Sequence, residues 1–159
     1  MLITEELKQF ADIVRESYKK VLPTERLAVE EHLFLANVEY AHLASLLWER
    51  NTKTVTDSYK LYLLEICLEH LFTALILSDN DVNEAIAACD ENIEYFYNVV
   101  EEKNYSYTLI VSLIATEYGA SQQQPDTLNK LAYALAILLK QQNITMLQFL
   151  DHYKTWKLK

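Results

Sequence analysis

The segment Glu39-Tyr-Ala-His42 has the spacing best suited to metal chemistry, because a helix brings residues three apart onto one side. A helical bundle that binds two metal ions needs two such pairs and a further Glu from each of two other helices. Glu65 and Glu69 do not complete that set, since the helical period turns the adjacent His70 away from both. A metal-binding helical-bundle enzyme or sensor centred on Glu39 and His42 is the alternative functional hypothesis. We assign no residue as a metal ligand.

The other histidines offer a weaker arrangement. His32 and His42 lie roughly 80° apart around one predicted helix, so we expect only one of them to approach His70 on the next helix. Imidazoles at the edge of a helical core usually form hydrogen bonds with other protein groups. We therefore interpret these histidines as core-edge residues and predict no cofactor.

The segment from Arg26 to His32 has five residues between the two, a spacing that resembles the Arg-x(4–6)-His signature of the HEPN family of helical ribonucleases. The resemblance implies that Arg26 and His32 act on the RNA backbone at a dimer interface, and this is the third hypothesis. One glycine excludes a glycine-rich phosphate loop, and no nucleophile or acid pair has a recognisable catalytic spacing. We assign no catalytic residue and leave open whether the chain is an enzyme, favouring a non-enzymatic protein.

Helices are the elements expected to position these residues. One Gly and two Pro in 159 residues speak against sheets, which need both residue types in tight turns. We predict an all-α single domain over residues 1–159, a bundle of six to seven helices in antiparallel hairpins, with a short helical-hairpin solenoid as the alternative. The predicted helices are Thr4–Leu22, Thr24–Arg50, Ser58–Leu77, one starting at Asp81, Ser106–Tyr118 with Gly119 as its cap, Asp126–Gln142, and one starting at Thr145.

Apolar spacing predicts which sides of these helices are buried. The second helix is apolar nearly all round, so we expect neighbours on every side of it, and the leucine-rich third helix also looks central. Thr4 and Thr24 are predicted caps, and Pro23 is predicted to end the first helix. The spacings Asp81-x-x-Glu84 and Thr145-x-x-Gln148 predict capping boxes at the starts of the fourth and last helices. The faces predicted for the first and last helices are Leu7, Phe10, Ala11, Val14, Tyr18 and Val21, and Leu147, Leu150, Tyr153 and Trp156.

Negative charge is concentrated in one part of the chain. The net charge is −9, and residues 61–102 hold ten acids with no Lys or Arg, whereas the other 117 residues hold 13 acids and 14 bases. On the predicted fourth helix, four glutamates recur at intervals of seven, three and seven along one side: Glu84, Glu91, Glu94 and Glu101. Such a field speeds association with a basic partner, so these four are the predicted partner-binding residues. A solvated outer face, neutralised in part by bases of the last helices, is the competing interpretation.

The leading functional hypothesis is a non-enzymatic interaction or regulatory protein, of inhibitor or immunity-protein character, that binds a protein partner of basic charge. No basic stripe is present, so we expect no nucleic-acid partner. The longest apolar run has nine residues against the roughly 20 of a membrane span, and the first residues lack the features of a secretory signal. With Cys67 and Cys89 expected as free buried thiols, we predict a cytoplasmic protein. A homo-oligomer is an alternative, because the predicted helices after residue 105 carry few charges.

Overall fold

The computed structural model describes residues 4–48, 56–78, 81–87 and 145–159. Residues 82–87 are helical, and this part of the chain contains no strand, which confirms the all-α class. The five helices with bounds in it are α1 (Thr4–Lys19), the 3-10 helix η1 (Pro23–Glu25), α2 (Val29–Trp48), α3 (Asp57–Leu77) and α7 (Met146–Lys157).

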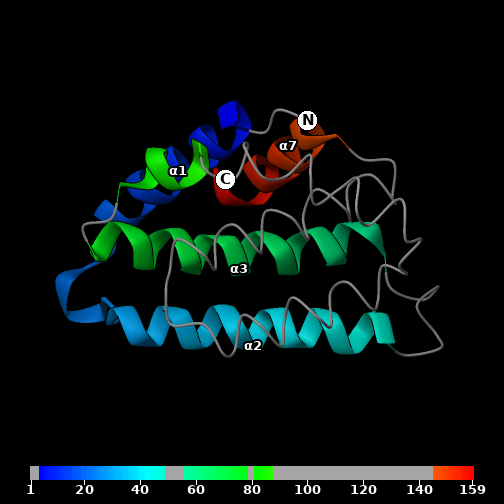
Figure 1. The fold of residues 1–159 in the computed structure, drawn as a ribbon, viewed down its shortest axis with the longest axis horizontal. Helices are drawn as coiled ribbons and strands as arrows, with labels where there is room; N and C mark the ends of the chain where they lie inside the picture. The colour runs from blue at the N-terminus through cyan, green and yellow to red at the C-terminus, as the bar shows by residue number, and fades with distance from the viewer. Residues whose placement is uncertain (1–3, 49–55, 79–80, 88–144) are drawn as a thin grey trace.

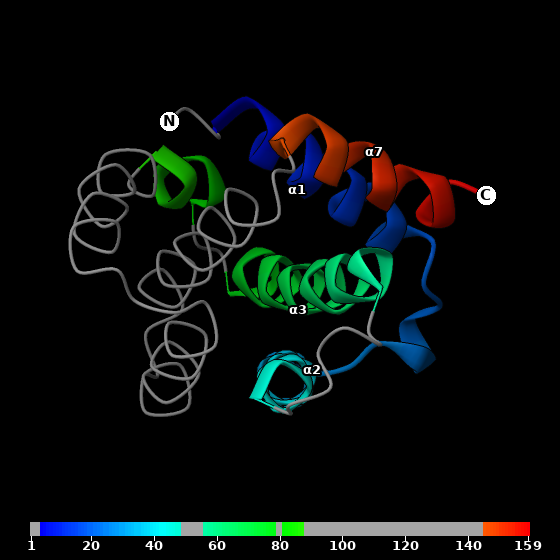
Figure 2. The same ribbon diagram turned by 90° about the vertical axis from the view of Figure 1, so that its right-hand side faces the viewer.

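The described helices α1, α2, α3 and α7 form three layers with α3 in the middle. α2 and α3 run side by side in opposite directions, as predicted for a helical hairpin (Figure 1). α1 and α7 pack against each other and against the side of α3 that is turned away from α2 (Figure 2). α3 therefore contacts α1, α2 and α7, and the side chains it directs to either side form the core of the described residues.

α1 begins at Thr4 and carries two glutamates in its first turn, where carboxylates favour the positive end of the helix. It ends at Lys19, three residues before the predicted Leu22. Pro23 does not follow the helix directly but opens η1, because its fixed φ suits the first position of a helical turn. The predicted apolar face is confirmed at its centre: Leu7, Phe10, Ala11 and Val14 are buried, and Tyr18 and Val21 are half-buried.

The predicted start of the second helix at Thr24 is wrong. Thr24 lies inside η1, and Arg26 is extended with φ −76° and ψ 131°, so α2 begins only at Val29. A different residue stabilises this end of the helix. The backbone N–H of Ala28 donates to Glu31 Oε1 at 3.2 Å, which satisfies an amide group that precedes the helix.

α3 starts beside Thr56, whose hydroxyl accepts the backbone N–H of Tyr59 at 3.2 Å in the manner of an N-terminal cap. Its central position is confirmed by burial on several sides, including Leu61, Leu63, Leu64, Cys67, Leu68, Leu71, Phe72, Ala74 and Leu75. The exposed fraction of Tyr59 is 40% and that of Tyr62 is 37%, so the first turns of α3 carry its exposed aromatic rings.

α7 has the predicted capping box. Gln148 N–H donates to Thr145 Oγ1 at 3.1 Å, and Thr145 N–H donates to Gln148 Oε1 at 2.8 Å. The prediction that Leu147 is buried is wrong, since 57% of it is exposed. The residues buried in α7 are Met146, Phe149, Leu150 and Tyr153. The last three follow Met146 by three, four and seven residues, which brings all four to one side of the helix, whereas Leu147 lies on another side.

Four aromatic rings join α1, α3 and α7. The centroid of Phe10 lies 4.2 Å from Tyr153, 5.6 Å from Phe72 and 6.0 Å from Phe149. All four residues are at most 1% exposed, so their rings are removed almost completely from water. The Phe10 ring of α1 therefore contacts aromatic rings of both α3 and α7.

The prediction that α2 is surrounded on every side is wrong. Its buried side contacts α3, where the Cys67 thiol donates to the carbonyl oxygen of Ala36 at 3.2 Å. On another side, Phe34 is 66% exposed and Val38 is 43% exposed. The physical reason is the layer order, because α2 lies outermost among the described helices and packs against α3 (Figure 2). An apolar sequence all round the helix does not require a partner all round it within the same chain.

Several predictions fall outside the described residues. These are the fourth helix beyond residue 87, the helices predicted at 106–118 and 126–142, the Gly119 cap, and Cys89. The expected total of six to seven helices is therefore not confirmed. None of the described helices combines the length and the apolar character that crossing a membrane requires.

Candidate functional site

Glu65 is a carboxylate enclosed between α3 and α7, and its side chain has no exposed area. Its two oxygens have separate partners on α7. His152 Nδ1 lies 2.7 Å from Oε1, and Trp156 Nε1 donates to Oε2 at 3.0 Å. Burial raises the pKa of Glu65 to about 7, although the hydrogen bonds from His152 and Trp156 oppose that rise. The carboxyl group therefore changes charge near neutral pH.

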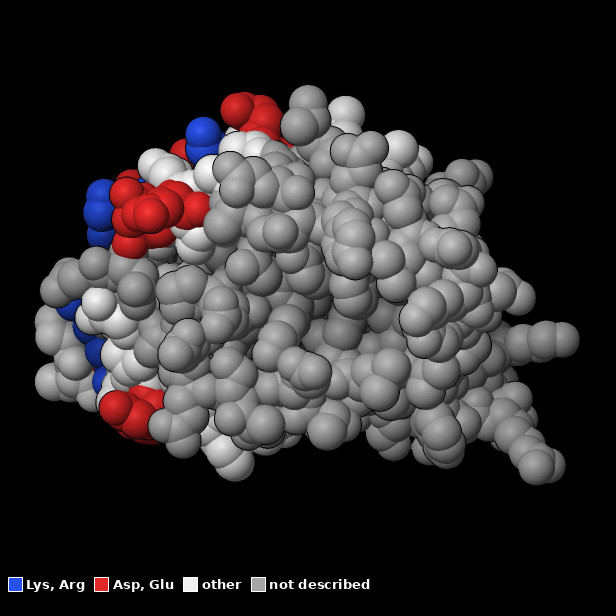
Figure 3. Space-filling view, viewed as in Figure 1, with Lys and Arg blue, Asp and Glu red and all other residues white. Residues whose placement is uncertain are grey.

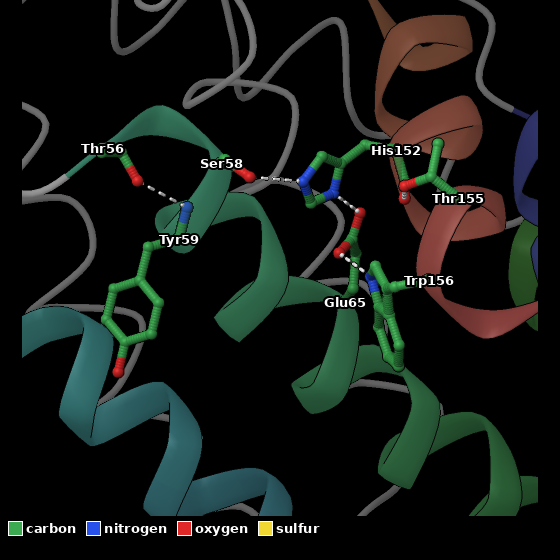
Figure 4. Close-up of polar contacts among 7 residues, drawn as sticks. All are labelled: Thr56, Ser58, Tyr59, Glu65, His152, Thr155 and Trp156. Carbon is green, nitrogen blue, oxygen red and sulfur yellow. Dashed lines mark hydrogen bonds and ion pairs between the residues drawn. The ribbon is translucent and has the colours of Figure 1, made fainter. Parts of the chain in front are cut away.

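The hydrogen bonding continues from His152 to the first turn of α3. His152 Nε2 lies 2.8 Å from the hydroxyl oxygen of Ser58, the second residue of that helix (Figure 4). We name this sequence of groups the Ser58–His152–Glu65 chain. When Glu65 is ionised it accepts the Nδ1 proton of His152, which leaves Nε2 free to accept the proton of the Ser58 hydroxyl.

Local sequence patterns did not reveal the Ser58–His152–Glu65 chain. His152 is 94 residues from Ser58 and 87 residues from Glu65, so no short sequence motif can contain His152 together with either of them. The available signal is weak: Ser58 and Glu65 are seven residues apart, which places them on one side of a helix, and His152 precedes the buried Tyr153. Only the packing of α7 on α3 brings the histidine between them.

Glu69 extends the polar contacts one helical turn beyond Glu65. The hydroxyl of Tyr153 donates to its Oε2 at 2.8 Å, and Lys157 Nζ lies 3.0 Å from the same oxygen. Burial, and then the charge of Glu69, raise the pKa of Tyr153 well above its usual range, so its hydroxyl remains a donor. Lys157 of the last helix therefore neutralises Glu69, one of the ten acids of residues 61–102. At this position the structure agrees with the competing interpretation, in which bases of the last helices partly neutralise the acidic residues.

His32 and His70 meet between α2 and α3. Their Nδ1 atoms are 3.0 Å apart, so one ring donates and the other accepts. Burial lowers the pKa of both groups, and proximity to His32 lowers that of His70 further. His32 Nε2 is buried without a hydrogen-bond partner among the described residues. The prediction that only one histidine of α2 approaches His70 is confirmed, and that histidine is His32.

The metal hypothesis gains no third donor from the described residues. Glu39 is half-buried, whereas His42 is exposed, with its ring 6.2 Å from that of Tyr59. Within the described ranges, no three or more His, Cys, Asp or Glu side chains are grouped so as to hold a metal ion. The ribonuclease-like pair is also separated by its contacts. Arg26 donates through Nε to the carbonyl of Val21 at 3.2 Å and is exposed, while His32 is buried.

Of the four predicted partner-binding residues, Glu84 alone is described. It is exposed, and its backbone N–H donates to Asp81 Oδ1 at 3.1 Å, which fits the predicted capping pattern at the start of this helix. Glu91, Glu94 and Glu101 lie outside the described residues. In Figure 3, coloured acids and bases lie close together at the end of the molecule where residues 82–87 stand in front of α1, and near the start of α2. Among the described residues on that face, the surface is therefore not uniformly acidic.

The exposed apolar residues of α2 form a surface that the sequence did not reveal. Phe34, Val38 and His42 recur every four residues and share one side of the helix, and all three are exposed. Glu30 and Glu31, also exposed, precede them in the first turn. We name these five residues the α2 surface. Its far end meets the exposed rings of α3 where His42 contacts Tyr59.

No family model, curated protein or solved structure matches this chain. The candidate sites therefore depend on the geometry described above.

Proposed function

We propose that this chain is a protein-interaction protein whose α2 surface binds a partner that presents an apolar segment flanked by Lys or Arg. The observation that carries the proposal is the exposure of Phe34, of which 66% is accessible, in the second turn of α2. An isolated exposed apolar residue is ordinary, but Phe34 is followed by an exposed Val38 one turn later. Contiguous apolar exposure along a helix is typical of surfaces that another protein covers.

The apolar part of the α2 surface supplies binding energy. Burying a Phe or Val side chain is worth about 1.5–3 kcal/mol, so these two residues are sufficient for a small hot spot. The rings of Tyr59 and Tyr62 are stacked 6.4 Å apart, and Tyr62 contacts Trp156 at 5.0 Å. Exposed aromatic residues on α3 thus extend the surface beyond His42, and aromatic side chains are the residues most enriched at interface centres.

The charge of α2 selects the chemistry of the partner. Val29–Trp48 contains three acids, Glu30, Glu31 and Glu39, and no Lys or Arg. A partner with basic residues beside its apolar ones gains attraction during approach, while an acidic partner is repelled. The net charge of −9 acts in the same direction. A basic amphipathic helix laid along α2 satisfies both requirements.

The proposal includes the finer predictions made from the sequence. The chain is a single bundle of six to seven helices, acts in the cytoplasm, and belongs to the inhibitor or immunity-protein class of interaction proteins. The glutamates Glu84, Glu91, Glu94 and Glu101 form a second contact region for the same basic partner. The exposed position of Glu84 supports this role.

Site-specific photo-crosslinking tests the proposal. The photoreactive residue p-benzoylphenylalanine replaces Phe34 in one variant and Leu147 in a matched control, since both positions are exposed apolar helix residues at 66% and 57%. Both proteins are irradiated in extract of the cells that produce the chain, and the crosslinked species are identified by mass spectrometry. A further reaction in about 0.5 M NaCl tests the electrostatic part, because salt screens charge within a few ångströms.

The expected result is a defined protein crosslinked from position 34 and not from position 147, through a peptide that contains apolar residues and Lys or Arg, in lower yield at high salt. The same products from both positions would show that the α2 surface has no special affinity. A product that contains only a second copy of this chain would overturn the proposal in favour of self-association.

A further inference from the structure

We propose that Ser58 is an activated nucleophile, with His152 as its general base, and that the chain hydrolyses small activated carboxylic esters through an acyl group held on Ser58. The basis is the Ser58–His152–Glu65 chain, with 2.8 Å between the hydroxyl and Nε2 and 2.7 Å between Nδ1 and the carboxylate. A hydroxyl, an imidazole and a carboxylate in this order form the arrangement that converts a weak hydroxyl into a nucleophile. This inference is independent of the α2 surface.

The three side chains of the Ser58–His152–Glu65 chain are increasingly buried from Ser58 to Glu65, as this chemistry requires. Ser58 is exposed and can meet a substrate, the His152 side chain is 23% exposed, and the Glu65 side chain is 0% exposed. The buried carboxylate holds the Nδ1 proton and stabilises the positive charge that forms on the imidazole. Trp156 fixes the other carboxylate oxygen at 3.0 Å, which limits rotation of the group. Glu65 is therefore a positioning residue that acts through His152.

The start of α3 supplies a group that stabilises negative charge on the reacting carbonyl. Ser58 is the second residue of this helix, and a backbone N–H in that position has no partner inside the helix. The cap does not occupy it, because Thr56 Oγ1 accepts the N–H of Tyr59 instead. A carbonyl oxygen that becomes negative beside Ser58 thus lies at the positive end of a helix of 21 residues.

The reaction follows two balanced steps. In the first, Ser58 Oγ bonds to the ester carbonyl carbon while its proton passes to His152 Nε2; the bond to the alkoxy group then breaks, and that proton passes to the departing alcohol. In the second, water gives a proton to Nε2 and its oxygen bonds to the acyl carbon. The Oγ–carbon bond breaks, the proton returns to Oγ, and the carboxylic acid leaves. Ester and water give acid and alcohol, with no other reactant.

The exposure of Ser58 sets the substrate class. An exposed nucleophile makes few contacts with the remainder of an ester, so little binding energy is available to activate a stable carbonyl. Esters with a good leaving group, such as phenyl acetates, need the least activation. Amides, whose leaving groups are far poorer, are not expected to react.

The protonation of Glu65 gives the reaction a characteristic pH dependence. When the carboxyl group is protonated, it donates to Nδ1, so Nε2 carries the proton and donates to Ser58 Oγ, and the serine is no longer activated. The groups that face Glu65 are His152 and Trp156 from α7, with Glu69 on its own helix. Because the pKa of Glu65 is about 7, reactivity should rise with pH through neutrality and level off above it.

The test uses the full-length protein and a fluorophosphonate that carries a fluorophore, which forms a stable bond to an activated serine with loss of fluoride. The labelled residue is located by peptide mass spectrometry, and labelling rates are measured from pH 5.5 to 9. The variants are Ser58→Ala, His152→Gln and Glu65→Gln. Ser78→Ala is the matched control, because the Ser78 hydroxyl donates to the Ala74 carbonyl at 2.8 Å and contacts no histidine among the described residues. Far-UV circular dichroism checks that each variant folds.

We expect labelling at Ser58 that is unchanged in Ser78→Ala, absent in Ser58→Ala, and slower by about 10²–10⁴-fold in His152→Gln, the usual effect of a general base. Hydrolysis of 4-nitrophenyl acetate should follow the same order. Glu65→Gln should remove the rise in rate near pH 7. Label found only at residues other than Ser58, or an equal rate in His152→Gln, would overturn the proposal. If His152→Gln does not fold, a wild-type rate at Ser58 that does not change between pH 6 and 8 would overturn it.

Discussion

The substitution Glu65→Gln should remove a cost to stability that the wild-type protein carries at neutral and alkaline pH. Glutamine has the shape of a protonated glutamic acid. Its oxygen can accept from Trp156 Nε1 and its amide group can donate to His152 Nδ1, so the buried contacts on α7 are retained. What the variant lacks is the charge, which burial between α3 and α7 disfavours.

The magnitude follows from the pKa of Glu65, which is about 7 in the folded protein against an ordinary value of 4.5. Between these two values the folded protein holds a proton that the unfolded chain has lost. Stability from this group is thus fully present below pH 4.5 and is lost as pH rises through about 7. At about 1.4 kcal/mol for each pH unit, the loss amounts to about 3 kcal/mol.

Urea unfolding at pH 5, 6, 7 and 8 measures this effect. The free energy of unfolding of wild type is compared with that of Glu65→Gln at each pH, so that titrations common to both proteins cancel. The difference should be within about 1 kcal/mol at pH 5 and should favour the variant by about 3 kcal/mol at pH 8. Glu84→Gln, which removes an exposed carboxylate, is the control and should not reproduce this change. A difference that is constant from pH 5 to 8 would refute the reasoning.

Three further predictions concern the fold. Phe10→Ala should lower the free energy of unfolding by about 3–5 kcal/mol in chemical denaturation, because it empties the centre of the aromatic core, while Leu147→Ala, at a site 57% exposed, should change it little. Burial raises the pKa of the Cys67 thiol, so a Cys89→Ser variant should react with Ellman's reagent only in denaturant, and rapid reaction in buffer would contradict the burial. Thr145→Ala should cost about 1 kcal/mol by loss of the capping box and Thr145→Ser much less, and equal unfolding midpoints for the two would contradict this role.

Elements governed by local rules could be predicted from the sequence. The capping box of Thr145 and Gln148 is confirmed because both hydrogen bonds lie within one helical turn. The apolar spacing in α1 likewise identified Leu7, Phe10, Ala11 and Val14, which are buried. These features depend on residues near one another in the chain, and their spacing is visible in a single sequence.

Features that depend on the order of the layers could not be predicted in this way. The apolar composition of α2 is equally compatible with a central and an outer helix, and Phe34 was assigned to the wrong environment for that reason. His152 could not be connected to Ser58 or Glu65, because the contact requires α7 to pack on α3 after a separation of about 90 residues. The sequence also does not determine that α1 ends at Lys19 and that a 3-10 helix, and not the next α-helix, begins at Pro23.

The central claim is that the α2 surface binds a protein partner, and the dissociation constant of the partner captured at position 34 tests it most directly. Phe34→Ala should raise Kd by about 30-fold, which corresponds to a hot spot of about 2 kcal/mol. Leu147→Ala should leave Kd unchanged, and Kd of wild type should rise with NaCl concentration because the α2 surface is acidic. An identical Kd for wild type and Phe34→Ala, measured by isothermal titration calorimetry with both proteins folded, would contradict the claim.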